Sequence, residues 1–366
     1  MTVTPRGEWA VRLNSIPFAA SAKLRVLWDG LGPEGLSASG DADWAAAAGL
    51  SSDVAARWRR QALACDAEGE VRRLESLGGR VLVHGEPGYP SLLASVADAP
   101  LMLSAQGRLD SLPGVAVVGS RVPTAYGRRV AKSLAGGAAR RGAAVVSGLA
   151  RGVDAVAHEA ALDAGGATWA VLGSGLGEVY PPENRDLARR IVDEGGCVLS
   201  EYPCATMPAP GLFPRRNRIV AALSWATVVV EGRAVSGSLL TAKNALEYGR
   251  EVLAVPGPID SPMSEAPHRL IRDGARPVFS VEDVLAAIPS GHILLPAPLR
   301  RVREAPELEG EEARILGVLG SEMYSLEELG GMTGLDMSRL SLIMFGLEIK
   351  ELVTSAPGQR YGKKNL

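Results

Sequence analysis

The sequence predicts an α/β protein with a doubly wound sheet, preceded by a helical domain and followed by a winged-helix domain. Between residues 114 and 255, short apolar runs recur and a helix-length segment separates most of them, which predicts the sheet. The first 80 residues hold four of the six tryptophans among Ala-rich stretches and lack strand-like runs, which favours helices. After residue 310, three helical segments and a hairpin are typical of a winged helix-turn-helix.

Changes in composition divide the chain into four parts. We expect a small helical, SAM-like domain over residues 1–80, an α/β domain over 81–287, a Pro- and charge-rich linker over 288–310 and a winged helix over 311–366. In the last part, Ser325 is expected to cap a short helix.

Six apolar runs predict the buried parallel strands: GVAVVG, AAVVSG, TWAVLG, CVLSEY, ATVVVEG and EVLAVPG. The helical patterns between them cover residues 125–141, 152–165, 183–195, 215–224 and 238–249. Ligands of such sheets bind beyond the carboxyl ends of the strands, so functional residues are expected directly after these runs.

Composition excludes several classes of protein. The formal net charge of the 366 residues is −2, so a site for nucleic acid or phosphate has to be a local basic patch. The three cysteines, Cys65, Cys197 and Cys204, show no C-x-x-C spacing, which argues against a disulfide framework or a zinc site. No signal peptide or membrane-spanning run is found, and we expect a cytoplasmic protein without a membrane partner.

The segment GVAVVGSR ends a predicted strand with Gly119, Ser120 and Arg121. Backbone N–H groups, a hydroxyl and the dipole of the next helix favour an anion here. A dinucleotide fingerprint needs a glycine where Arg121 stands, so a dinucleotide cofactor is not expected. The alternative is an ordinary strand–helix turn.

A second turn of this kind lies in EGRAVSGSLLTAKNA, where Ser238 replaces the lysine of a phosphate loop. Nucleoside triphosphate hydrolysis is therefore not expected, and we predict no cofactor. A single phosphate would be held by the small residues at the start of this helix and by a lysine one turn later: Ser236, Gly237, Ser238, Thr241 and Lys243. The alternative is a helix capped by Ser236 or Ser238.

The segment FPRRNRIV places an aromatic ring and an amide among three arginines: Phe213, Arg215, Arg216, Asn217 and Arg218. A ring in a loop beside guanidinium groups suits base stacking next to backbone phosphates. The alternative is that the ring fills the core and the arginines form a solvated face. Residues 147–162 add His158, but no Ser/His/Asp arrangement is found.

Taken in order, these motifs resemble the DNA-processing protein A family (DprA/Smf). The resemblance covers VVGSR, SGLARGVDAVAHEAAL, YPPEN, LSEYP, FPRRNRI, SGSLLTA and VPGPID. It implies an extended Rossmann-like fold and a non-enzymatic protein that acts in DNA uptake, competence and natural transformation. Such a protein binds single-stranded DNA without sequence preference, loads the RecA recombinase onto it and forms a homodimer.

The resemblance also implies roles for single residues. The two turns would each hold a phosphate, Arg216, Asn217 and Arg218 would line the pocket between them, and Asn184 would border it. Phe213 would stack on a base. The dimer seam would contain Leu270 and Ile271, together with His268 where the family has an asparagine. The winged helix is acidic, so we expect a protein contact there and no reading of duplex DNA.

The alternative is a nucleotide phosphoribohydrolase of the lysine-decarboxylase-like fold. That family follows a Pro-Gly-Gly-x-Gly-Thr turn promptly with a catalytic glutamate. In SGSLLTAKNALE the first acid is Glu247, so the base for cleavage of the sugar bond is missing from its expected place.

Overall fold

In the computed structural model, the chain divides into two compact units, residues 1–300 and 301–366. The structure describes residues 4–289, 310–319, 323–349, 352–356 and 360–363. The predicted linker, residues 288–310, lies almost wholly outside the described residues.

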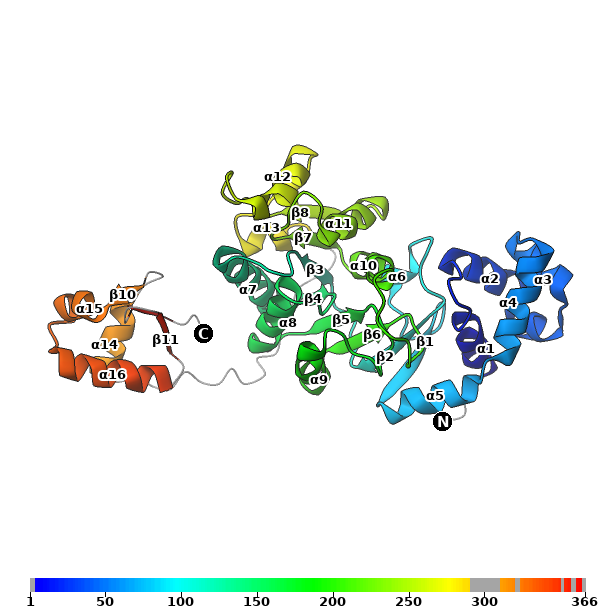
Figure 1. The fold of residues 1–366 in the computed structure, drawn as a ribbon, viewed down its shortest axis with the longest axis horizontal. Helices are drawn as coiled ribbons and strands as arrows, with labels where there is room; N and C mark the ends of the chain where they lie inside the picture. Colours follow the sequence, from blue (N-terminus) through cyan, green and yellow to red (C-terminus); the bar gives the residue numbers. More distant parts are fainter. Residues whose placement is uncertain (1–3, 290–309, 320–322, 350–351, 357–359, 364–366) are drawn as a thin grey trace. The chain divides into compact units, whose positions relative to one another are not determined.

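The first unit begins with five helices, drawn in blue in Figure 1: α1 (Pro5–Asn14), α2 (Ser21–Ala38), α3 (Asp41–Ala48), α4 (Ser52–Ala64) and α5 (Ala67–Ser76). Their core is built around the buried rings of Trp9, Trp28, Trp44 and Trp58. Gly32 has a φ of 62° and kinks α2, as expected for the turn signal DGLGPEG. The predicted helical texture of residues 1–80 is confirmed.

A sheet follows, and within the described residues it has nine strands in the order β1-β2-β6-β5-β4-β3-β7-β8-β9. The strands are β1 (Gly79–Val83), β2 (Met102–Gly107), β3 (Gly114–Val118), β4 (Ala144–Ser147), β5 (Thr168–Leu172), β6 (Cys197–Ser200), β7 (Ala226–Val229), β8 (Glu251–Ala254) and β9 (Arg276–Pro277). All six predicted strands are present. Strands β1 and β2 were not predicted; β2 pairs antiparallel with both β1 and β6.

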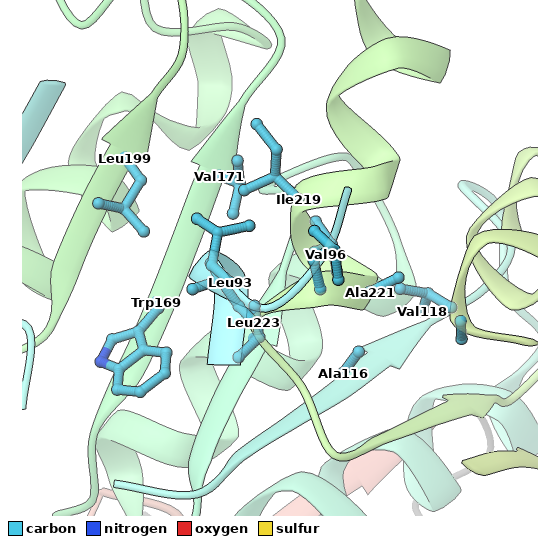
Figure 2. Packing of buried hydrophobic residues seen from close by; sticks show 14 of the residues in the cluster. Leu93, Val96, Ala116, Val118, Trp169, Val171, Leu199, Ile219, Ala221 and Leu223 are labelled. Carbon is cyan, nitrogen blue, oxygen red and sulfur yellow. The ribbon is translucent and has the colours of Figure 1, made fainter. Parts of the chain in front are cut away.

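Helices cover both faces of this sheet, which confirms the doubly wound prediction. One face packs against α6 (Ser91–Ala94), α10 (Leu212–Ala222), α11 (Gly237–Glu247) and α12 (Glu265–Arg272). The other packs against α7 (Ala125–Arg140), α8 (Val153–Asp163), α9 (Arg185–Asp193) and α13 (Val281–Leu285). Figure 2 shows Ile219 of α10 and Leu223, the residue after that helix, in the same buried cluster as Val171 and Trp169 of β5 on the first face.

The strand order fixes the position of the site. From β3 the sheet grows through β4, β5 and β6 on one side and through β7 and β8 on the other. Crevices at the carboxyl ends of strands form where the strand order reverses, which here is between β3 and β7. The loops after β3, β4, β5 and β7 therefore meet near one edge of the sheet.

The second unit contains α14 (Glu311–Val318), β10 (Tyr324–Ser325), α15 (Leu326–Thr333), α16 (Met337–Ile349), β11 (Val353–Ala356) and β12 (Arg360–Lys363). Ser325 accepts a hydrogen bond from the Glu328 backbone N–H, and the Glu328 carboxylate accepts one from the Ser325 backbone N–H. This capping box confirms the predicted start of α15. Three helices and a three-stranded sheet form the predicted winged helix.

Among the described residues, no helix has the length and apolar character that crossing a bilayer requires.

Candidate functional site

An aromatic and cationic cluster lies at the carboxyl ends of β3 and β5. The guanidinium carbon of Arg121, which follows β3, lies 5.8 Å from the centre of the Phe213 ring. Tyr180, from the loop after β5, packs against the same ring with 5.6 Å between ring centres. Gly173 makes room for this cluster, because a Cβ there would lie 2.6 Å from Phe213. The sequence singled out both Arg121 and Phe213, and the structure brings the two side chains together.

These side chains line one small cavity. Its lining residues come from the three loops after β3, β4 and β5 and from the start of α10: Arg121, Gly148, Ala150, Arg151, Tyr180, Pro181, Phe213 and Arg216. Three of the eight are arginines and two are aromatic. A guanidinium next to an accessible ring can bind a phosphate while the ring stacks on the neighbouring base.

Arg216 forms the floor of this cavity and is buried. Its guanidinium donates to the carbonyl oxygens of Gly148 and Val171, at 2.5 Å in the case of Gly148. A Cβ at Gly148 would lie 2.4 Å from Nη2 of Arg216, so this position requires glycine. Burial lowers the pKa of Arg216 to about 10, while the Asp154 carboxylate opposes that shift, so the guanidinium stays charged at neutral pH.

Asp154 and Asn184 hold the loop after β4 in place. The Asp154 carboxylate accepts hydrogen bonds from the backbone N–H groups of Gly148 and Ala150, at 3.1 and 3.3 Å. The Asn184 amide donates to the Leu149 carbonyl at 2.9 Å. Leu149 needs this support, because its φ of 55° is uncommon for a residue with a side chain. Asn184 is buried and thus supports the site from beneath rather than bordering open space.

The turn after β3 differs from the prediction in one respect. Gly119 lies between neighbouring elements, since a Cβ there would lie 2.8 Å from Val153. The Ser120 hydroxyl accepts a hydrogen bond from the Val122 N–H at 3.1 Å. The dipole of α7 was expected to serve an external anion, but Glu231 already fills that position.

The Glu231 carboxylate accepts hydrogen bonds from the Thr124 N–H and hydroxyl, at 2.9 and 2.5 Å. Glu231 is buried beside the first turn of α7. A carboxylate at a helix N-terminus satisfies the free N–H groups there, so the N-terminus of α7 is not open to a phosphate.

The start of α11 offers a smaller polar surface than the sequence suggested. Ser236 caps the helix, and its hydroxyl lies 2.8 Å from that of Ser238, which is buried, as is Thr241. Gly237 is exposed, and a Cβ there would meet nothing within 4 Å. Asn217 donates to the Gly237 carbonyl at 3.3 Å and so links α10 to this turn. Lys243 is exposed and pairs with Glu247 at 3.7 Å.

Arg218 is not brought into the cavity. Its guanidinium forms an ion pair with Glu201, donates to the Asp98 carbonyl at 2.8 Å and to the Ser21 hydroxyl at 2.9 Å. These contacts join α10 to the N-terminal helices. Arg215 also faces that way, since it donates to the Ala19 carbonyl at 3.1 Å.

The family model described as DNA recombination-mediator protein A matches residues 80–289. A second model, the DprA winged helix domain, matches residues 300–359. The first match covers more than half of the chain and contains every element of the cavity.

The chain belongs to the DNA recombination-mediator protein A family.

Two relatives show how far the family likeness extends. Protein Smf of Escherichia coli is 38% identical over 275 residues, which is 74% of each chain. The DNA processing protein DprA of Streptococcus pneumoniae is 44% identical over 200 residues, 54% of this chain and 70% of that protein.

Solved structures of the family agree with the fold. The structure of DprA from S. pneumoniae superposes with a TM-score of 0.68 at 33% identity, covering 79% of this chain and 99% of that one. A structure described as showing the single-stranded DNA binding mode of DNA processing protein A from Helicobacter pylori gives a TM-score of 0.52 at 30% identity. It covers 57% of this chain and 94% of that one.

In this DprA-family chain, the predicted dimer residues lie on α12. Leu270 is buried in the core of the sheet and Ile271 packs partly against that core. The His268 Nε2 lies 3.0 Å from the Gly257 carbonyl. Of α12, the exposed positions are Glu265, Arg269 and Arg272, so a partner on this helix would meet charged side chains.

Among the basic and aromatic side chains of the cavity in this DprA-family chain, sequence reasoning missed two. Tyr180 was passed over because it precedes two prolines in a loop, although the segment YPPEN was noted. Arg151 lies within the motif SGLARGVDAVAHEAAL but was given no role, and its guanidinium pairs with Glu183. A basic or aromatic residue within the loop that follows a predicted strand was the signal that could have found both.

Proposed function

We propose that this protein binds single-stranded DNA without sequence preference at the cavity between Arg121, Phe213 and Tyr180. The observation that carries the proposal is the exposed Arg121 guanidinium stacked 5.8 Å from a ring that is itself half-buried and held by a second ring. Backbone phosphates carry no base identity, and every base has a face on which an aromatic ring can stack. Binding at such a site therefore favours a flexible single strand over a duplex.

The family supports a wider role. We propose that the protein acts as a homodimer in the cytoplasm, loads the RecA recombinase onto single strands during natural transformation and recombination, and has no catalytic activity of its own. Within α11, the first turn holds no acidic residue, which gives no support to nucleotide phosphoribohydrolase activity. Ser236 and Gly237, at the start of α11, are proposed as a secondary contact for a DNA phosphate.

The test is fluorescence anisotropy with labelled oligo-dT and a matching duplex at two salt concentrations. We expect Phe213→Ala to weaken single-strand binding by about 1–3 kcal/mol, because a stacking ring is lost. Arg121→Ala should weaken all sequences alike and reduce the salt dependence, because it removes one phosphate contact.

Arg141→Ala is the matched control. This arginine follows the last residue of α7, at the opposite end of the sheet, and is comparably exposed. Its removal changes the net charge as Arg121→Ala does and should leave binding unchanged. Equal effects of the two substitutions would mean that only overall charge matters and would remove the cavity from the mechanism.

A further inference from the structure

The loop between α1 and α2 exposes a phenylalanine at a cost in free energy. Phe18 is 88% exposed, and its φ of 59° lies in the left-handed region that residues with side chains avoid. Such strain persists only where the surroundings hold the backbone in place, and it gathers at functional positions. An exposed aromatic side chain with a strained backbone therefore requires a reason.

The loop is anchored on both sides of Phe18. The Asn14 amide donates to the Glu201 carbonyl at 2.7 Å, and the Ser21 hydroxyl donates to the Glu201 carboxylate at 2.7 Å. Ile16 and Ala19 are buried in the helical core. The ring of Phe18 is thus presented to solvent by a fixed support and not by a loose segment.

Arg215 connects this loop to the proposed DNA site. Its guanidinium donates to the carbonyl of Ala19, the residue after Phe18, at 3.1 Å. Arg215 follows Phe213 by two positions in the first turn of α10. The first turn of α10 lies between two cavities. Phe213 lines the cavity described above, and Pro214 and Arg215 line a second one.

This second cavity has a volume of about 590 Å³. That volume is within the range of nucleotide-sized sites. Its lining residues come from the α6 segment, α10 and α11: Ser95, Val96, Ala97, Asp98, Pro214, Arg215, Arg218, Asn244, Glu247 and Tyr248. The carboxylates of Asp98 and Glu247 are engaged by Arg218 and Lys243. Within the described residues, Arg215 has no ion-pair partner, so its charge is available to a ligand.

We propose that a single strand of DNA leaves the Phe213 cavity across the first turn of α10 and makes a second contact on the N-terminal helices. Arg215, in the first turn of α10, binds a backbone phosphate, and Phe18, in the loop between α1 and α2, stacks on a base. The proposal rests on the single-stranded DNA binding proposed above and extends it by at least one nucleotide. The N-terminal helices thereby become part of the DNA-binding surface.

Two substitutions in the full-length protein test this. Phe18→Gly removes the ring, and glycine adopts the observed φ without strain, so the fold is kept or stabilised. Arg215→Gln removes the charge but retains an amide that can donate to Ala19. Thermal unfolding confirms that both variants are folded, and anisotropy is then measured with oligo-dT of about 5 and about 20 nucleotides.

We expect Phe18→Gly to weaken binding of the long strand at least about fivefold, with an unchanged salt dependence, since stacking involves no counterions. Arg215→Gln should lower the slope of log K against log salt by about 0.7, the value for one phosphate of a single strand. Neither variant should change binding of the short strand, which fills the Phe213 cavity alone. Phe345→Ala, which removes an exposed ring from α16, is the control.

Two results distinguish the failures. If the long strand binds the wild type and both variants equally, the second contact is refuted while the Phe213 site stands. If the wild type binds neither strand, the proposed function itself fails. If Phe18→Gly weakens self-association of the protein but leaves its affinity for DNA unchanged, the ring belongs to a protein contact and the proposal is overturned.

Discussion

At the scale of single residues, the site depends on a buried charge, the guanidinium of Arg216. Arg216 is buried between β5 and the loop after β4, and its guanidinium donates to the backbone carbonyls of Val171 and Gly148 there. A buried guanidinium requires compensation, which Asp154 supplies. The sequence identified Arg216 as a site residue but could not reveal its burial, because the partners Gly148 and Val171 lie 68 and 45 residues away.

His158 provides a residue-scale prediction for the dependence of stability on pH. Its Nδ1 donates to the Thr168 hydroxyl at 2.7 Å, and Thr168 in turn donates to the Val145 carbonyl. Burial first, and repulsion by Arg216 second, lower the pKa of His158 to about 3 from its ordinary 6.5. The unfolded chain therefore binds a proton below pH 6.5 that the folded chain does not bind until about pH 3.

We expect this group to lower the free energy of unfolding by up to about 1.4 kcal/mol for each pH unit below 6.5. In His158→Gln that contribution is absent. The difference in stability between wild type and variant, measured by urea unfolding, should therefore shift against the wild type as the pH falls from 7 to 4. If the stability of the wild type and of the variant changes in parallel over this range, folding does not lower the pKa of His158.

At the scale of elements, the sequence predicted the strands and helices that a local pattern of apolar residues determines. Six apolar runs became strands, and every predicted helix between them is present within a few residues of its expected bounds. Strand β2 was missed because it is fixed by pairing with β6, almost a hundred residues further along, and β1 was missed because it is fixed by pairing with β2. Arg121 and Phe213 were each singled out by local pattern, the first at a strand–helix turn and the second as a ring beside arginines.

Arg218 was expected in the same pocket and instead joins two elements. Its neighbours Glu201 and Asp98 are distant in sequence, so the ion pairs were not visible in the FPRRNRI motif. We expect Arg218→Ala to destabilise the protein by about 3–5 kcal/mol, because it leaves the largely buried Glu201 carboxylate without its cationic partner. Single-strand affinity, measured where the variant is folded, should change little.

Urea unfolding of Arg218→Ala and of the double variant Arg218→Ala/Glu201→Gln checks this. The second substitution removes the orphaned charge and should restore part of the lost stability. If Arg218→Ala is as stable as the wild type but binds single strands poorly, Arg218 belongs to the DNA site after all.

At the scale of the whole molecule, the winged helix forms a compact unit with its own core of buried leucines and isoleucines. In winged-helix proteins that read duplex DNA, the second helix of the motif carries basic residues. Arg339 is the one basic residue of α16, and it pairs with Glu311 at 2.8 Å. The same helix exposes Leu342 and Phe345, which suits contact with a protein.

We therefore expect a chain ending at residue 300 to bind oligo-dT with a Kd within about twofold of the full-length value, because the two units are compact on their own. Anisotropy on both proteins measures this, with duplex DNA as the second ligand. Loss of single-strand binding, or duplex binding that disappears with residues 301–366, would place nucleic-acid recognition in the winged helix.

Strand β9 has a consequence for how copies of this protein can associate. It is two residues long, both are exposed, and the second is Pro277, which has no N–H to offer a neighbouring strand. A short edge with a proline is a poor template for strand addition. Copies of this protein are thus hindered from joining their sheets through the β9 edge. Any association at this edge has to be made by side chains, which makes it reversible and open to adjustment by single substitutions.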